Sequence, residues 1–172
     1  MSKPRFLLDT NCFIEPCETF YPFCYAPAFW DALLRGHKAT MVFSLNEVKT
    51  EILDDEINNW IKGEGFPNTF FQKITNVEVQ KYAEIQNWVL QHPHFSLAEK
   101  SKFAEKKADG YLVAYAKVHD MIVVTQEKLI IDSNTKKVKI PNLCQQYDVE
   151  YVNLFEMLKQ LNVRFVLEDN QM

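Results

Sequence analysis

Three acidic residues lie at the end of short apolar stretches or within three residues of it, near the point where a strand would end. Asp9 closes the stretch RFLLD, Glu47 lies three residues after TMVFS, and Glu127 lies two residues after MIVVT. Each acid also has a simpler interpretation. Asp9 could cap a short helix, and Glu47 could complete a capping box with Ser44. Glu127 could be an ordinary loop acid.

Asp109 is different because it lies within a helical pattern. In ADGYLVAYAK, apolar residues follow it at three, four and seven positions, which places Asp109 on the same helical stripe as core residues. Burying a carboxylate costs several kcal/mol unless a cation or strong hydrogen bonds accompany it. Gly110 costs about 1 kcal/mol relative to Ala in a helix, which suggests a close approach to the backbone. The alternative is a helix break near Gly110, with Asp109 as a new N-cap.

Carboxylates that converge repel one another and raise each other's pKa unless a cation is present. Oxygen ligands favour Mg²⁺ or Mn²⁺, which can bind phosphate and activate a water for phosphodiester hydrolysis. The expected catalytic residues and ligands of one or two ions are Asp9, Glu47, Asp109 and Glu127. Polar neighbours expected to orient them are Thr10, Asn11 and Thr125. Glu51, one helical turn after Glu47, could share or replace its role.

The elements that would position these acids are strands alternating with helices. Strands are expected at 5–9, 40–44, 121–125 and 149–153. Helices are expected at 27–35, 45–62, 77–91, 97–119 and 154–161, with Asn76 as a candidate cap of the third. This order predicts an α/β fold with a mostly parallel sheet covered by helices on both faces. Ligands of such sheets bind beyond the carboxyl ends of the strands, where the strand order reverses.

Composition predicts a single domain spanning residues 1–172. No apolar run approaches the roughly 20 residues of a membrane span, so we expect a cytoplasmic protein that does not contact a membrane. The four cysteines have no CxxC spacing and are expected to be reduced thiols.

The net charge of −4 supplies no global attraction for nucleic acid, so a polyanion must be held locally. One basic stretch could contact RNA phosphates and consists of Lys100, Lys102, Lys106 and Lys107. A second contains Lys136, Lys137 and Lys139. A solvated face is the more frequent role of such runs.

The order of LLDTN, SLNEV, ADGYLVAYA and VVTQE resembles the PIN-domain nucleases, although the fourth acid is Glu rather than the commoner Asp. LLDTNCFIEP, YPFCYAPAFWDALLRG and VVTQEK are also similar to a PIN-like group catalogued as a domain of unknown function. The resemblance implies a three-layer α/β/α fold and a metal-dependent endoribonuclease that hydrolyses RNA with a metal-activated water. It further implies the toxin of a type II toxin–antitoxin pair, with an antitoxin partner and a homodimer as candidate assemblies.

Two other functions remain open from the sequence. A PIN-like module without activity could bind RNA or a protein, and the aromatic residues between Phe20 and Trp30 could form its surface, although core packing is their more frequent role. A phosphatase with Asp9 as nucleophile is less consistent with the sequence, because such enzymes usually need an acid where Asn11 stands.

Overall fold

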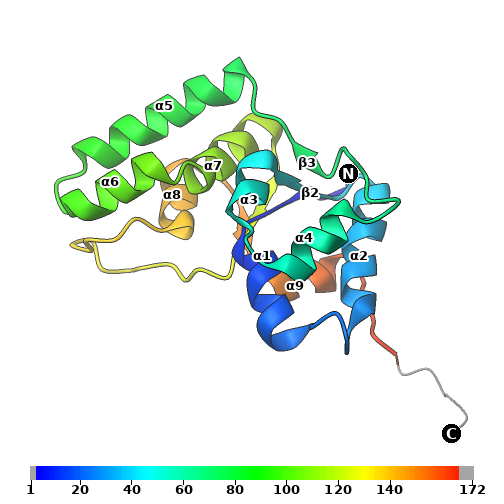
Figure 1. Cartoon of the computed structure of the whole chain (residues 1–172). Coiled ribbons are helices and arrows are strands. Elements are labelled where there is room, and N and C mark those ends of the chain that lie inside the picture. Colours follow the sequence, from blue (N-terminus) through cyan, green and yellow to red (C-terminus); the bar gives the residue numbers. More distant parts are fainter. Residues whose placement is uncertain (1–2, 167–172) are drawn as a thin grey trace, which may run out of the picture.

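The computed structural model describes residues 3–166, which form an α/β structure around one parallel sheet (Figure 1). The strands follow the order β3-β2-β1-β4-β5, and every strand pairing is parallel. Their bounds are β1 Phe6–Leu8, β2 Val42–Leu45, β3 Phe71–Gln72, β4 Ile122–Val124 and β5 Tyr151–Val152. The predicted parallel sheet is therefore confirmed, and β3 is an additional edge strand that the sequence analysis did not predict.

The strand order reverses between β1 and β4. From β1 the chain adds β2 and then β3 on one side, and it then crosses to add β4 and β5 on the other side. In the register of this central pair, Leu8 lies opposite Val124. The residues that follow the two strands are therefore neighbours at the carboxyl edge, which is where ligands of open parallel sheets bind.

Helices cover both faces of the sheet and give three layers (Figure 1). α7 packs against β1 and β4 and is itself covered by α5, while α2 packs against β2. The helix bounds are α1 Asn11–Glu15, the π-helix η1 Pro16–Phe20, α2 Pro27–Lys38, α3 Asn46–Glu51, α4 Asp55–Lys62, α5 Asn76–Gln91, α6 Leu97–Glu105, α7 Ala108–His119, α8 Ile140–Gln146 and α9 Leu154–Gln160. The three-layer α/β/α prediction is confirmed.

Two expected helices are each divided into two. The segment 97–119 breaks at Lys106, whose φ of −91° and ψ of 86° leave the helical region, so α6 and α7 are separate. The break precedes Asp109, which lies in the first turn of α7 and is not its N-cap. The segment 45–62 breaks after α3, and α4 begins where Asp54 accepts a hydrogen bond from the Ile57 amide.

Two predicted caps are wrong. Leu45, not Ser44, is the N-cap of α3, and the Ser44 hydroxyl donates instead to the carbonyl of Leu8 at 2.8 Å. The hydroxyl is buried at the sheet, and the Leu8 carbonyl supplies the hydrogen-bond partner that a buried polar group requires. The helix expected at 77–91 begins at Asn76 and is capped by Thr75, which forms a capping box with Glu78.

Gly110 lies where α7 approaches α5 and α6 closely, as its cost in a helix suggested. A Cβ added at Gly110 would lie 2.6 Å from the Tyr82 ring and 2.8 Å from the Phe103 ring. The missing side chain therefore lets α7, which carries Asp109, pack tightly between the sheet and the outer helices.

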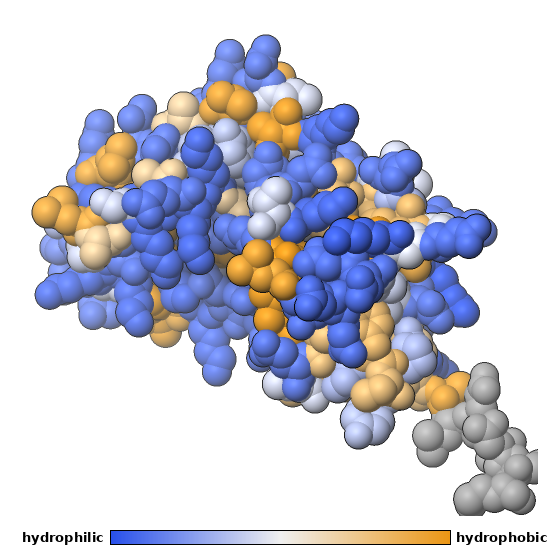
Figure 2. Space-filling view, in the orientation of Figure 1, coloured by the Kyte–Doolittle hydropathy of each residue, from blue (hydrophilic) through white to orange (hydrophobic). Residues whose placement is uncertain are grey.

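The aromatic residues near the N-terminus contribute mainly to packing. Phe29 and Trp30 are fully buried, and Phe23 stacks on Trp30 with ring centroids 4.0 Å apart. Tyr25 remains 85% exposed. The face of the molecule in Figure 2 is largely hydrophilic, with apolar side chains gathered in separate small patches. Among residues 3–166, no helix is long and apolar enough to cross a bilayer.

Candidate functional site

Asp9 and Thr125 meet at the reversal point of the sheet. Asp9 follows β1 and Thr125 follows β4, and the Asp9 amide donates to the Val124 carbonyl at 3.0 Å. The Thr125 hydroxyl donates to Asp9 Oδ2 at 3.1 Å, and the Thr10 amide donates to Oδ1 at 2.6 Å. Asp9 is only 2% exposed. Its carboxyl group is therefore held in a fixed orientation by both strands of the central pair.

The surroundings of Asp9 disfavour its charge. Burial, followed by the charges of Glu127 and Glu51, raises the pKa of Asp9 to about 7, although the hydrogen bonds from Thr125 and Thr10 oppose the shift. A raised carboxyl pKa beside other acids is typical of a site that a cation completes.

Asp109 reaches the same acids from α7. Burial and then the charges of Asp9, Glu127 and Glu51 raise the pKa of Asp109 to about 8. Asp109 lies in the first turn of a helix that packs on both central strands. The structure therefore brings the helix acid and the strand-end acid into electrostatic contact, as the helical stripe suggested.

Glu51, rather than Glu47, is the acid of α3 that faces this group. The Thr10 hydroxyl donates to Glu51 Oε2 at 2.9 Å, and Glu51 raises the pKa of both aspartates. Glu47 is partly buried, which raises its pKa, and its charge acts on Tyr111 of α7 instead. Its Oε2 is buried without a hydrogen-bond partner among the residues that the structure describes.

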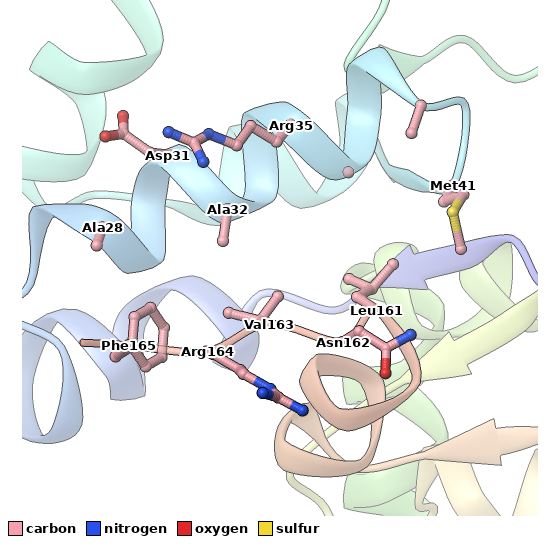
Figure 3. Close-up of a pocket in the computed structure, with 12 residues that line it drawn as sticks. Ala28, Asp31, Ala32, Arg35, Met41, Leu161, Asn162, Val163, Arg164 and Phe165 are labelled. Atoms are coloured by element: carbon pink, nitrogen blue, oxygen red, sulfur yellow. The ribbon is translucent and has the colours of Figure 1, made fainter.

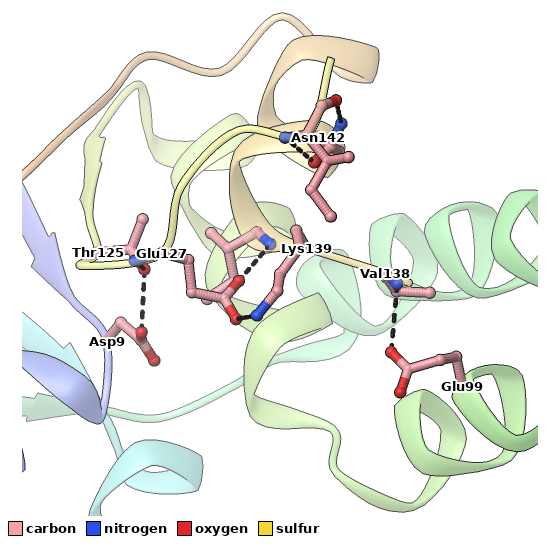
Figure 4. A network of polar contacts seen from close by, with 9 residues as sticks. Asp9, Glu99, Thr125, Glu127, Val138, Lys139 and Asn142 are labelled. Atoms are coloured by element: carbon pink, nitrogen blue, oxygen red, sulfur yellow. Dashed lines mark hydrogen bonds and ion pairs between the residues drawn. The ribbon is translucent and has the colours of Figure 1, made fainter. Parts of the chain in front are cut away.

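Glu127 interacts with the acids electrostatically, but its own carboxylate is already bound. The Lys139 ammonium donates to Oε1 at 2.5 Å, and the Ile140 amide donates to Oε2 at 2.8 Å (Figure 4). The Glu127 amide donates to the Thr125 hydroxyl at 3.2 Å. One short network therefore connects Asp9, Thr125, Glu127 and the start of α8.

The donor set fits a hard divalent cation. Within residues 3–166, no three His, Cys, Asp or Glu side chains already converge closely enough to hold a metal ion. Mg²⁺, however, is usually bound through one or two carboxylates and completes its shell with water. Asp9 and Asp109 supply two such carboxyls whose charges need compensation.

Lysine side chains surround the cavity beside these acids. A cavity of about 140 Å³ is lined by Asp109 and Glu127 together with four lysines, Lys102, Lys106, Lys137 and Lys139. Of the predicted basic stretch, Lys100 instead donates to the carbonyl of Leu90, and Lys107 is the N-cap residue of α7. Asn11 lines a second cavity of about 620 Å³, which shares Glu127, Lys137 and Lys139 with the first.

Sequence reasoning left two site residues unassigned. Glu51 was named as a residue that could share or replace the role of Glu47, because choosing between them requires knowing where α3 begins. Lys139 belongs to the second basic run. The sequence feature that could have identified it is its position just before Ile140 and Pro141, because a proline near the first position of a helix is a helix-start signal.

Another cavity lies apart from the acid group. It has a volume of about 450 Å³ and lies between α2 and residues 161–165 (Figure 3). Asp31 and Arg35 contribute its charged side chains from α2, and Arg164 contributes another from the opposite wall. None of the acids in the group described above lines this cavity.

The chain is similar to a family of proteins and to solved structures. The chain resembles the structure titled "Crystal Structure of FitAcB from Neisseria gonorrhoeae", with 21% identity, a TM-score of 0.49 and coverage of 86% of this chain and 96% of that chain. No curated protein matches the chain. The model of the family described as "Domain of unknown function (DUF4411)" matches residues 6–165. Because this match spans nearly the whole chain, the protein belongs to the DUF4411 family.

Proposed function

We propose that this protein is a PIN-type endoribonuclease that depends on Mg²⁺ or Mn²⁺ and cleaves RNA phosphodiester bonds. The observation that carries the proposal is the approach of Asp9 and Asp109 at the reversal point of a parallel sheet, where burial and neighbouring acids raise both pKa values. A scaffold without a cation has no reason to keep such a group of acids, because their repulsion destabilises the fold. The sequence resemblance to PIN nucleases supports the same function.

Asp9 and Asp109 would hold the cation, with Glu51 beside them. When bound, a divalent cation polarises a phosphodiester and lowers the pKa of a coordinated water. The chain itself supplies orientation: the Thr125 hydroxyl and the Thr10 amide fix the two oxygens of Asp9. The Thr10 hydroxyl similarly holds Glu51.

The lysines around the acid cavity supply local attraction for a polyanion, which the net charge of −4 does not. Lys102 lies on α6, Lys106 follows its last residue, and Lys137 lies in the segment before α8. Ammonium groups on both walls can bind phosphates that flank the scissile bond. RNA would therefore lie over the acids between α6 and this segment.

Cleavage of a fluorescent single-stranded RNA tests the proposal. We expect cleavage by the wild type with Mn²⁺ or Mg²⁺, none with EDTA, and a loss of at least about 100-fold in Asp109→Asn. Exposed Asp31→Asn on α2 is the matched control and should cleave like the wild type. Equal cleavage by Asp109→Asn and the wild type would contradict the proposal.

We further propose that the protein is the toxin of a toxin–antitoxin pair, which rests on the sequence resemblance. Induced expression of the wild type in a bacterial host should arrest growth, and expression of Asp109→Asn at an equal level should not. A product of the neighbouring gene that restores growth would be the antitoxin. Growth arrest by both forms would separate toxicity from the acid group and contradict this assignment.

A further inference from the structure

Both carboxylate oxygens of Glu127 accept a hydrogen bond from the protein itself. Oε1 accepts from the Lys139 ammonium at 2.5 Å and Oε2 accepts from the Ile140 amide at 2.8 Å. The side chain is only 17% exposed, so water competes weakly for these bonds. A cation bound through Glu127 would either displace one of these hydrogen bonds or lie beside the Lys139 ammonium, which repels it.

Lys139 is held in place by the segment that carries it. Its carbonyl accepts from the Leu143 amide at 3.1 Å, and the Ile140 side chain that follows is 1% exposed. One residue earlier, the Val138 amide donates to Glu99 Oε2 at 3.3 Å, which ties the segment to α6 (Figure 4). The backbone on both sides of Lys139 is therefore fixed to the fold.

The charge of Lys139 acts on the acid group as a whole. Partial burial opposes its charge, but the hydrogen bond to Glu127 and the charges of Glu127, Asp109 and Glu99 outweigh burial and raise the pKa of Lys139. Its ammonium therefore stays protonated at neutral pH, beside the carboxyls of the cavity that Asp109 lines. A fixed monovalent charge thus stands next to acids that otherwise repel one another.

We propose that Lys139 is a positioning residue that supplies the second positive charge of the site, so that Glu127 pairs with Lys139 and the site binds one divalent cation. Asp9 and Asp109 bind that cation. This inference rests on the proposed function, because it assumes that the acids bind a divalent cation at all. It assigns Glu127 to the protein's internal ion pair instead of to the metal.

Counting bound Mn²⁺ tests the assignment without an activity assay. The free ion can be measured by electron paramagnetic resonance during titration of the wild type, Lys139→Met, Lys139→Arg and Glu127→Gln. Lys136→Met is the matched control, because Lys136 is exposed in the same segment and lines neither cavity beside the acids. Circular dichroism of each variant establishes that it is folded.

We expect one Mn²⁺ per chain for the wild type, Lys139→Arg and Lys136→Met. Lys139→Met should bind two, because the freed Glu127 carboxylate gains a cation in place of the ammonium. Glu127→Gln should keep one ion with an affinity within about threefold of the wild type, whereas loss of a direct ligand or its support typically costs about 10–100-fold.

Two ions on the wild type, or a loss of tenfold or more in the affinity of Glu127→Gln, would overturn the inference and leave the proposed nuclease standing. A single ion on folded Lys139→Met would also overturn it. No Mn²⁺ bound by any of the proteins would instead overturn the proposed function, and this inference with it. If Lys139→Met does not fold, Glu127→Gln decides the question alone.

Discussion

Asp9 and Asp109 keep their protons at a pH where free aspartates are ionised. Their pKa values of about 7 and about 8 arise first from burial, and at Asp9 the hydrogen bonds from Thr125 and Thr10 offset this cost only in part. Sequence reasoning located both residues because a strand-end position and a helical stripe are local patterns. It assigned Glu47 to the site, with Glu51 as a residue that could share or replace its role, since the facing side of α3 depends on where that short helix begins.

The stability of the metal-free protein is expected to fall as the pH rises from about 4 to about 8. An unfolded aspartate loses its proton near pH 4, so in this window the folded state holds protons at Asp9 and Asp109 that the unfolded state has released. Each such proton changes the free energy of unfolding by about 1.4 kcal/mol per pH unit.

The Asp109→Asn variant has no carboxyl group at this position, so its folded state does not bind this proton. We expect its metal-free form to gain stability relative to the wild type by about 1.4 kcal/mol per pH unit between pH 5 and pH 8, because only folded Asp109 holds its proton in this range. Urea unfolding at the two pH values measures this, with exposed Asp31→Asn as the control. A pH-independent difference would show that burial does not raise the Asp109 pKa.

Glu47 and Glu51 lie on the same short helix, α3, so variants of the two residues can be compared directly. Because the Thr10 hydroxyl holds Glu51 beside Asp9 whereas Glu47 acts on Tyr111, Glu51→Gln should weaken Mn²⁺ binding about 10-fold or more. Glu47→Gln should change the affinity less than threefold. Calorimetric titration of both variants decides the matter, and the reverse order would assign the site to Glu47.

At the scale of elements, the position of Asp109 depends on where one helix ends and the next begins, rather than on how much of the chain is helical. The sequence pattern gives helical periodicity across 97–119, but the chain leaves the helix at Lys106, so Asp109 enters the site from the first turn of a new helix. Local propensity does not mark this break, because it depends on how α7 packs under α5 and α6. Short β3 and α8 were missed for a related reason, since two to seven residues carry little periodicity.

Gly110→Ala tests the close packing of α7. Ala forms helices better than Gly by about 1 kcal/mol, but here its Cβ would lie under 3.0 Å from the rings of Tyr82 and Phe103. Overpacking of this kind typically costs about 1–3 kcal/mol, so we expect net destabilisation. Urea unfolding gives the sign, with Ser101→Ala on exposed α6 surface as the control. A more stable Gly110→Ala would contradict the packing of these helices.

At the scale of the whole molecule, the strand order decides which residues meet. A β–α alternation predicts a parallel sheet, but it does not reveal that β4 pairs with β1. This pairing brings the Thr125 hydroxyl within hydrogen-bond distance of the Asp9 carboxyl group. Nor does the sequence tell which lysines share a cavity. Lys102 and Lys137 come from separate segments and meet only in the folded protein.

The charge distribution gives a prediction about RNA. The net charge is −4, yet lysines from two segments line the acid cavity. RNA affinity should therefore fall with rising salt, and Lys102→Gln with Lys106→Gln should lower the slope of log K against log salt by about 1–2. Fluorescence anisotropy at several salt concentrations measures the slope. Lys62→Gln, exposed at the end of α4, should leave it unchanged, and an equal reduction by this control would show diffuse binding instead.

The most direct measurement of the central claim is calorimetric titration of Mn²⁺ into the wild type and Asp109→Asn at pH 8. If Asp9 and Asp109 form a cation site at the reversal point of the sheet, the wild type binds with release of protons, and Asp109→Asn loses that binding while it stays folded. Binding of equal affinity to both proteins, or no binding to the wild type, would contradict the claim.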